Sequence, residues 1–228
     1  MIGPVVDVGS VPEWLKPLML VSEDLDARAF TRFSAPRGAR TRPAAVLVLF
    51  GEGERGPDVL LTRRADTLGS HPGQVAFPGG GADDGDDGPI GTALREAEEE
   101  TGVDPSGVRP LAVLPELYVP VSGFAVTPVL AHWETPSPVH AVDPGETAAV
   151  ARVTIADLVD PANRYQVQRH GHGWKGPVFE VGGLFVWGFT AGLLSVLLAL
   201  GGWEREWDHS DVRDLDVALA AHTNRERA

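Results

Sequence analysis

The chain has 228 residues, of which 43% are hydrophobic, and this is enough for one globular domain with an ordinary core. The absence of cysteine excludes disulfides, thiolate catalysis and cysteine-based zinc sites. A formal net charge of −13 argues against non-specific nucleic-acid binding, which needs clustered lysine and arginine. The sequence does not open with a basic segment followed by an apolar core, so no signal peptide is predicted and a cytoplasmic location is expected.

The first 43 residues are expected to form a helical extension packed on a domain that comprises residues 44–228. Two short helices are predicted in this extension, near residues 11–21 and 23–33, and a connector rich in proline and arginine follows them. The domain then begins with a continuous apolar run at residues 44–50, which is typical of a buried strand.

Strands dominate the middle of the chain, where apolar and β-branched residues recur in short runs. Pro115, Pro120 and Pro128 mark edges or bends of these strands. The C-terminal tail predicts a helix that follows a Ser210 N-cap. In chain order, further strands are predicted at residues 59–63, 108–118, 124–133 and 147–153, a turn of helix at 155–158, and the last helix at 211–221.

One long segment, residues 182–202, carries no charge and is long enough in principle to span a bilayer. Its first part reads as a strand at residues 184–187, however, and only residues 190–200 read as a helix. An apolar helix this short is typical of a buried core element, so no membrane span is expected. The His170-Gly-His172 segment has no third metal ligand nearby in the sequence and is expected to be a loop.

Three glutamates in residues 92–103 stand out because their spacing gathers negative charge. On a helix, Glu96, Glu99 and Glu100 lie at i, i+3 and i+4 and share one face. Like charges at such spacings each cost roughly 0.2–0.5 kcal/mol, and Arg95 can reach Glu99 but not all three. A hard divalent cation such as Mg²⁺ would offset this repulsion. The alternative is an ordinary solvated acidic helix face.

The surroundings of this helix strengthen the metal interpretation. A glycine turn at residues 77–81, Phe-Pro-Gly-Gly-Gly, precedes an acidic loop at 82–89, and Gly102 ends the helix. This order resembles the Nudix box, the signature of the Nudix hydrolases, and residues 95–103 fit its Arg-Glu-apolar-any-Glu-Glu-any-Gly-apolar part without a gap. One acidic position departs from the pattern, because either Asp87 or, with one extra loop residue, Asp86 stands where the family has a glutamate.

A second motif runs directly into the box. The segments Leu-Leu-Thr-Arg-Arg-Ala at 60–65 and His-Pro-Gly-Gln-Val-Ala-Phe-Pro-Gly-Gly at 71–80 resemble the extra signature of the coenzyme A pyrophosphatase branch. A plain strand, turn and strand would explain the apolar alternation, but not the combined placement of the arginine, histidine and glycines. A later element resembles that branch as well, at Trp187, Gly188, Thr190 and Ala191.

The resemblance implies an α+β fold, the Nudix α/β/α sandwich with a mixed β-sheet between helices. It also implies metal-dependent hydrolysis of the diphosphate of coenzyme A (CoA) or acyl-CoA, giving adenosine 3′,5′-bisphosphate and (acyl-)phosphopantetheine. Two alternatives stay open. One is a Nudix hydrolase of another nucleoside diphosphate derivative, such as an ADP-sugar, NADH or a dinucleotide. The other is a non-catalytic nucleotide-sensing domain, against which the intact glutamate set argues.

Residue roles follow from the same resemblance. Glu96, Glu99 and Glu100 would hold Mg²⁺ or Mn²⁺, the carbonyl of Gly80 or Gly81 would join them, and Arg95 would orient the carboxylates. Glu96 is the first candidate for the general base and Glu146, in the loop at 143–146, the second. Arg63 and Arg64 are the nearest cations to the box, and one of them is expected to meet the 3′-phosphate of CoA. The residues expected to contact the substrate are Arg63, Arg64, His71, Gly79 and Gly80. The expected partner is a small-molecule substrate, and neither nucleic acid nor a membrane is expected. A homodimer is left open.

Overall fold

The structure, a computed structural model, describes residues 2–36, 38–69, 71–169 and 174–226, so the His170-Gly-His172 segment lies outside the described residues. A mixed sheet of nine strands forms its centre, in the order β1-β6-β8-β2-β3-β4, with β5 paired to β2, β7 to β8 and β9 to β3. The strands are β1 (Gly3–Pro4), β2 (Arg42–Gly53), β3 (Gly56–Arg64), β4 (Val75–Ala76), β5 (Gly79–Gly81), β6 (Val108–Val113), β7 (Leu117–Val119), β8 (Phe124–Trp133) and β9 (Thr147–Thr154).

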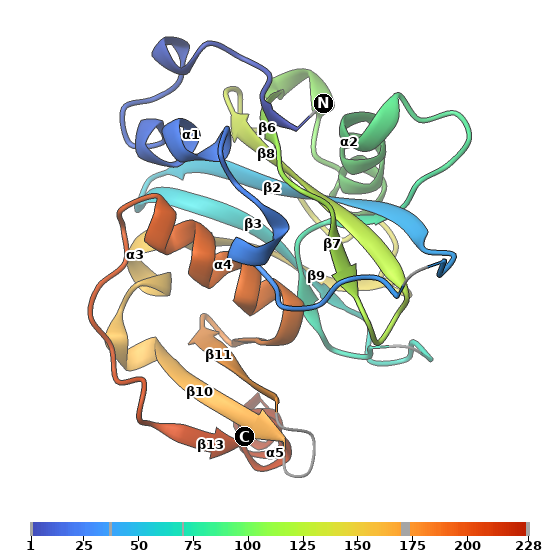
Figure 1. The fold of residues 1–228 in the computed structure, drawn as a ribbon. Coiled ribbons are helices and arrows are strands. Elements are labelled where there is room, and N and C mark those ends of the chain that lie inside the picture. Colours follow the sequence, from blue (N-terminus) through green and yellow to red (C-terminus); the bar gives the residue numbers. More distant parts are fainter. Residues whose placement is uncertain (1, 37, 70, 170–173, 227–228) are drawn as a thin grey trace.

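Helices cover both faces of this sheet (Figure 1). On one face lies α2 (Gly88–Thr101), and on the other lie α1 (Lys16–Ser22) and α4 (Gly188–Leu200). The short α3 (Ile155–Leu158) follows β9. This arrangement confirms the predicted α+β architecture with a mixed sheet between helices.

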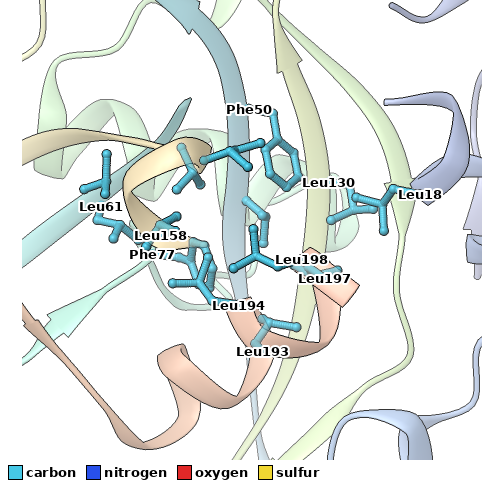
Figure 2. Close-up of a cluster of buried hydrophobic side chains, with 14 of the residues drawn as sticks. Leu18, Phe50, Leu61, Phe77, Leu130, Leu158, Leu193, Leu194, Leu197 and Leu198 are labelled. Carbon is cyan, nitrogen blue, oxygen red and sulfur yellow. The ribbon is translucent and has the colours of Figure 1, made fainter. Parts of the chain in front are cut away.

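Strand β2 explains how one sheet supports two cores, because its residues alternate between the two faces. Ala45, Leu47 and Leu49 belong to the cluster under α2, whereas Val48 and Phe50 belong to the cluster under α1 and α4. Figure 2 shows the second cluster, in which Leu193, Leu194, Leu197 and Leu198 of α4 gather beside Phe50, Phe77 and Leu130. The apolar segment near residue 190 is therefore a core helix, as predicted, and no helix in the described part of the chain is both long and apolar enough to cross a membrane.

A second, four-stranded sheet follows in the C-terminal part, in the order β12-β11-β10-β13. Its strands are β10 (Arg164–Arg169), β11 (Trp174–Val181), β12 (Leu184–Val186) and β13 (Val212–Asp214), and α5 (Leu215–Glu226) packs beside it through Leu215 and Ala218. Arg164 joins this sheet to the rest of the fold, because its buried guanidinium donates to Ser195 on α4 at 3.0 Å and to Glu204 at 3.1 Å.

Several predicted elements differ from the structure. The helix expected near residues 11–21 begins only at Lys16. The helix expected near residues 23–33 is only a 3₁₀ turn, Ala27–Ala29, begun by the Asp26 carboxylate. The strand expected at 108–118 is broken around Pro115 into β6 and β7. The C-terminal helix starts at Leu215, after β13, and Asp214 accepts from the N–H groups of its first turn. Ser210 bonds to Asp208 instead and caps no helix.

Candidate active site

The carboxylates of the site are carried by α2, whose sequence fits its place in the fold. Pro89 is in the first turn, where a missing N–H costs nothing. Ala93 and Ala97 are fully buried against the sheet, so the helix lies close to it. Gly102 ends the helix in the left-handed conformation, with φ of 66°. This geometry turns Glu96 and Glu100 toward β5 and leaves the Glu99 side chain 59% exposed.

The glycine turn before the helix meets these two carboxylates. The N–H of Gly79 donates to Oε2 of Glu100 at 3.2 Å. A Cβ atom at position 80 would overlap the carboxylate of Glu96, so only glycine allows the strand and the helix to approach this closely. The expected neighbourhood of Gly79, Gly80, Glu96 and Glu100 is thus present in the structure.

Arg95 ties the acidic loop to the helix. Its Nε and Nη2 donate to the two carboxylate oxygens of Asp86 at 2.8 and 3.0 Å, and Nη2 also donates to the carbonyl of Gly81 at 3.0 Å. Its Nη1 reaches Glu96 at 2.9 Å and Glu99 at 3.1 Å. The orienting contact expected between Arg95 and the box glutamates is therefore formed.

Asp86, and not Asp87, is the partner of Arg95. The Asp86 carboxylate also accepts from the N–H of Asp83 at 2.9 Å and from the hydroxyl of Thr92 at 2.8 Å. The hydrogen bonds from Arg95, then those from Asp83 and Thr92, hold the pKa of Asp86 well below its usual range. Asp87 precedes the helix without a side-chain capping bond. The sequence did not single out Asp83 or Thr92, because their role depends on the folded loop.

The four other predicted residues lie at the end of β3 and beside it. The backbone of Arg64 donates to the carbonyl of Gln74 at 2.9 Å, and the next residue, Ala65, donates to the carbonyl of Glu146 at 2.8 Å. Glu146 therefore lies at the start of β9, beside the end of β3, and its side chain is exposed. Arg63 bonds to Asp66 at 3.1 Å. His71 is exposed in the following turn, with φ of 55°.

Burial and charge act together on the glutamates. Burial raises the pKa of Glu100 to about 7; the Gly79 N–H and the nearby charge of Arg64 oppose this rise, whereas Glu96 and Glu146 add to it. Burial also raises the pKa of Glu96, although Arg95 opposes the change. The charges of Glu96, Glu146 and Arg64 thus all act on Glu100, although Glu146 and Arg64 are far from α2 in the sequence.

Comparison with known proteins agrees with this geometry. The family described as the NUDIX domain matches residues 40–174, more than half of the chain. The chain belongs to the Nudix family.

Among the relatives of this Nudix hydrolase is the uncharacterized Nudix hydrolase NudL of Cronobacter sakazakii. It is 42% identical over 159 residues, which make up 68% of this chain and 81% of the relative. NudL of Escherichia coli K12 is 39% identical over the same shares. A solved structure, the Nudix hydrolase RenU of M. Smegmatis, shares the fold with a TM-score of 0.52 and 21% identity, covering 77% of this chain and 96% of RenU.

The protein is accordingly a pyrophosphatase of the Nudix type, acting on a nucleoside diphosphate derivative, and Nudix hydrolases generally use divalent metal ions. The donor set fits such an ion, because carboxylate and carbonyl oxygens are the ligands that Mg²⁺ and Mn²⁺ prefer. Burial also raises the pKa of Glu96 and Glu100, so a bound cation would stabilise their charged forms. Within the described residues, however, no three acidic or histidine side chains already form a metal cage. The Glu99 carboxylate accepts from Arg95 instead. Its side chain would have to rotate toward Glu96 and Glu100 to become a third carboxylate ligand.

Cavity size does not identify this site. One cavity, about 450 Å³, lies in the C-terminal part of the Nudix hydrolase, and its lining includes Glu180, Arg213, His222 and Arg225. A smaller one, about 230 Å³, lies beside the box loop, and its lining includes Asp83, Asp86 and Thr92. We place the active site by its chemistry, because the larger cavity has none of the box residues.

Proposed function

We propose that the protein hydrolyses the diphosphate of CoA or acyl-CoA, giving adenosine 3′,5′-bisphosphate and (acyl-)phosphopantetheine. The observation that carries this proposal is the continuity of the second motif with the box. The end of β3, the turn with His71, and β4 lead without interruption to the glycine turn that contacts Glu96 and Glu100. The motif resembling that of CoA pyrophosphatases is thus part of the wall around the carboxylates.

The residues divide the work of an in-line attack by water on phosphorus. Glu96, Glu99, Glu100 and the carbonyl of Gly80 would hold Mg²⁺ or Mn²⁺, and the bound ion would offset charge on the diphosphate and acidify water. Arg95 keeps Glu96 and Glu99 in place through its Nη1, while Asp86 holds the rest of its guanidinium. A Cβ atom at position 79 would overlap the backbone of Ala45 and Val46, and one at position 80 would overlap the Glu96 carboxylate, so glycine at both positions lets β5 lie between β2 and α2.

For the general base, the contacts favour Glu146 over Glu96, which reverses the order expected from the sequence. The Glu96 carboxylate already accepts from Arg95 at 2.9 Å and is enclosed by β5. Glu146 is exposed, and its carboxylate forms no hydrogen bond or ion pair in the described structure. A carboxylate with unused lone pairs is better able to accept a proton from water.

A product assay tests the substrate. CoA, dephospho-CoA, ADP-ribose, NADH and a diadenosine polyphosphate are each incubated with the protein and Mg²⁺ or Mn²⁺, and the products are separated by chromatography. We expect the highest kcat/KM for CoA, with adenosine 3′,5′-bisphosphate and phosphopantetheine as products. A Glu99→Gln variant is the control for contaminating activity. Better turnover of ADP-ribose or NADH would identify a different Nudix substrate, and nucleotide binding without any turnover would indicate a sensor.

A further inference from the structure

The neighbouring residues Arg63 and Arg64 lie on opposite faces of the main sheet. Leu60 belongs to the cluster under α2, and Arg64 lies four residues later on the same face of β3. Leu61 belongs to the opposite cluster, and Arg63 lies two residues after it. The pairing of β3 with β4 agrees, since Arg63 is opposite Val75, which is buried in the cluster away from α2.

A bulge beside these arginines does not change this alternation. Arg63 pairs with Ala149 and Arg64 with Thr147, so the extra residue lies in β9 and not in β3. Arg64 therefore shares a face with the helix that carries Glu96 and Glu100. It also lies beside the start of β9, where Glu146 is found.

The two guanidinium groups differ in their partners as well. Arg63 Nη2 donates to both carboxylate oxygens of Asp66, at 3.1 and 3.3 Å. A Cβ atom at Gly73 would lie 3.6 Å from that same nitrogen, so Arg63 packs against the turn that follows β3. This contact holds Arg63 on the side of the sheet away from the carboxylates.

Arg64 lacks such a partner in the described part of the chain. Its guanidinium forms no ion pair within 4.0 Å there, and its Nε is enclosed without a hydrogen-bond partner. The charge of Arg64 acts on Glu100, and the backbone of the next residue, Ala65, donates to the carbonyl of Glu146, so Arg64 lies near both glutamates. A half-buried cation near Glu100 that forms no ion pair in the described part of the chain keeps its two terminal nitrogens available for another anion, because only Nε is enclosed.

The geometry points to Arg64 as the residue that binds the diphosphate itself, with its guanidinium fork on two phosphate oxygens, and it leaves Arg63 outside that contact. A planar guanidinium matches phosphate oxygens in a bidentate manner, and its charge would stabilise the charge that develops as the bond to the leaving group breaks. Arg64 therefore does not serve the 3′-phosphate of CoA. This inference rests on the proposed function only because the substrate must contain a diphosphate, and it does not require that the substrate be CoA.

Binding of methylenediphosphonate tests the contact directly, because this non-hydrolysable probe has no adenine, sugar or 3′-phosphate. Calorimetry with Mg²⁺ compares the full-length wild type with Arg64→Ala, Arg64→Lys, Arg63→Ala and Arg55→Ala. Arg55 is the matched control, since it pairs with Asp157 and is not part of the site. We expect Arg64→Ala to weaken binding by about tenfold or more, the loss typical of a charge-assisted contact, and Arg64→Lys to weaken it less. Arg63→Ala should weaken binding several-fold less than Arg64→Ala, and Arg55→Ala should not change it.

Steady-state kinetics distinguish diphosphate binding by Arg64 from a purely structural role of this residue. They also test this inference separately from the proposal that CoA is the substrate. Arg64→Ala should lower kcat/KM on CoA and dephospho-CoA by the same factor, and added methylguanidine should restore part of the rate while the melting temperature stays unchanged. Unaltered probe binding in Arg64→Ala, no probe binding by the wild type, or an equal loss in Arg63→Ala would overturn the inference. Hydrolysis of ADP-ribose but not CoA, with the same dependence on Arg64, would overturn only the proposed substrate.

Discussion

Arg95 donates from Nε and Nη2 to the two carboxylate oxygens of Asp86, at 2.8 and 3.0 Å. This pair joins the acidic loop to the middle of α2, nine residues later in the chain. The remaining nitrogen of Arg95, Nη1, then points to Glu96 and Glu99. The positions of the two glutamates thus depend, through Arg95, on a residue of the acidic loop.

Replacement of Asp86 by alanine should therefore lower kcat by about tenfold or more, because displaced catalytic groups lose rate steeply with distance. Asp87→Ala is the matched control, since this aspartate is next in sequence and its side chain caps no helix N–H. Steady-state kinetics at saturating Mg²⁺ measure the effect, with circular dichroism to check the fold. An equal loss in both variants would show that the loop acts through its charge and not through the Asp86–Arg95 pair.

The metal assignment predicts a ligand-dependent stability. Mg²⁺ or Mn²⁺ should raise the melting temperature, because an ion that binds the folded state stabilises it by about 2.7 kcal/mol at a hundred times its Kd. Glu99→Gln and Glu100→Gln should lose this shift and nearly all turnover. Glu98→Gln, the same change on the exposed side of α2, should keep both. Equal metal binding in all variants by calorimetry would refute the site.

The metal-free protein should lose stability as the pH rises. Burial raises the pKa of Glu100 from 4.5 to about 7, so the folded state holds this proton more tightly than the unfolded state does. Protonation of Glu100 therefore stabilises the folded protein. The stabilisation from this proton is complete below pH 4.5 and is lost as the pH rises through about 7. The free energy of unfolding should fall by on the order of 3 kcal/mol over this range. Urea unfolding in EDTA at a series of pH values measures this slope. Glu100→Gln should flatten it and Glu98→Gln should not; an unchanged slope in Glu100→Gln would contradict the assignment.

The general base can be separated from the metal ligands. Glu146→Gln should lower kcat by about 100-fold or more, the range typical of general-base catalysis, while the thermal shift with Mg²⁺ persists. Glu96→Gln should lose both. If Glu146→Gln stays fully active, Glu96 becomes the candidate, as the sequence first suggested.

Elements with a local signal were predicted closely. The strand at residues 124–133 and the helical turn at 155–158 have the predicted bounds, and the glutamate helix ends at Thr101, before Gly102. In these segments the apolar pattern, the prolines and the glycine determine the local structure through residues only a few positions apart. One strand was missed because its pairing partner is distant. β13 exists because it pairs with β10, more than forty residues earlier, and nothing in its own three residues predicts a strand.

The sequence by itself determined the family, the α+β fold and the three glutamates, because the box is a contiguous segment whose helical spacing alone gathers charge on one face. Tertiary structure decided which aspartate holds Arg95, which of two adjacent arginines faces the glutamates, and that Glu146 lies beside the end of β3. Alternation along a strand separates Arg63 from Arg64 in any sheet. Only the packing of α2 on one face determines which of them lies with the carboxylates.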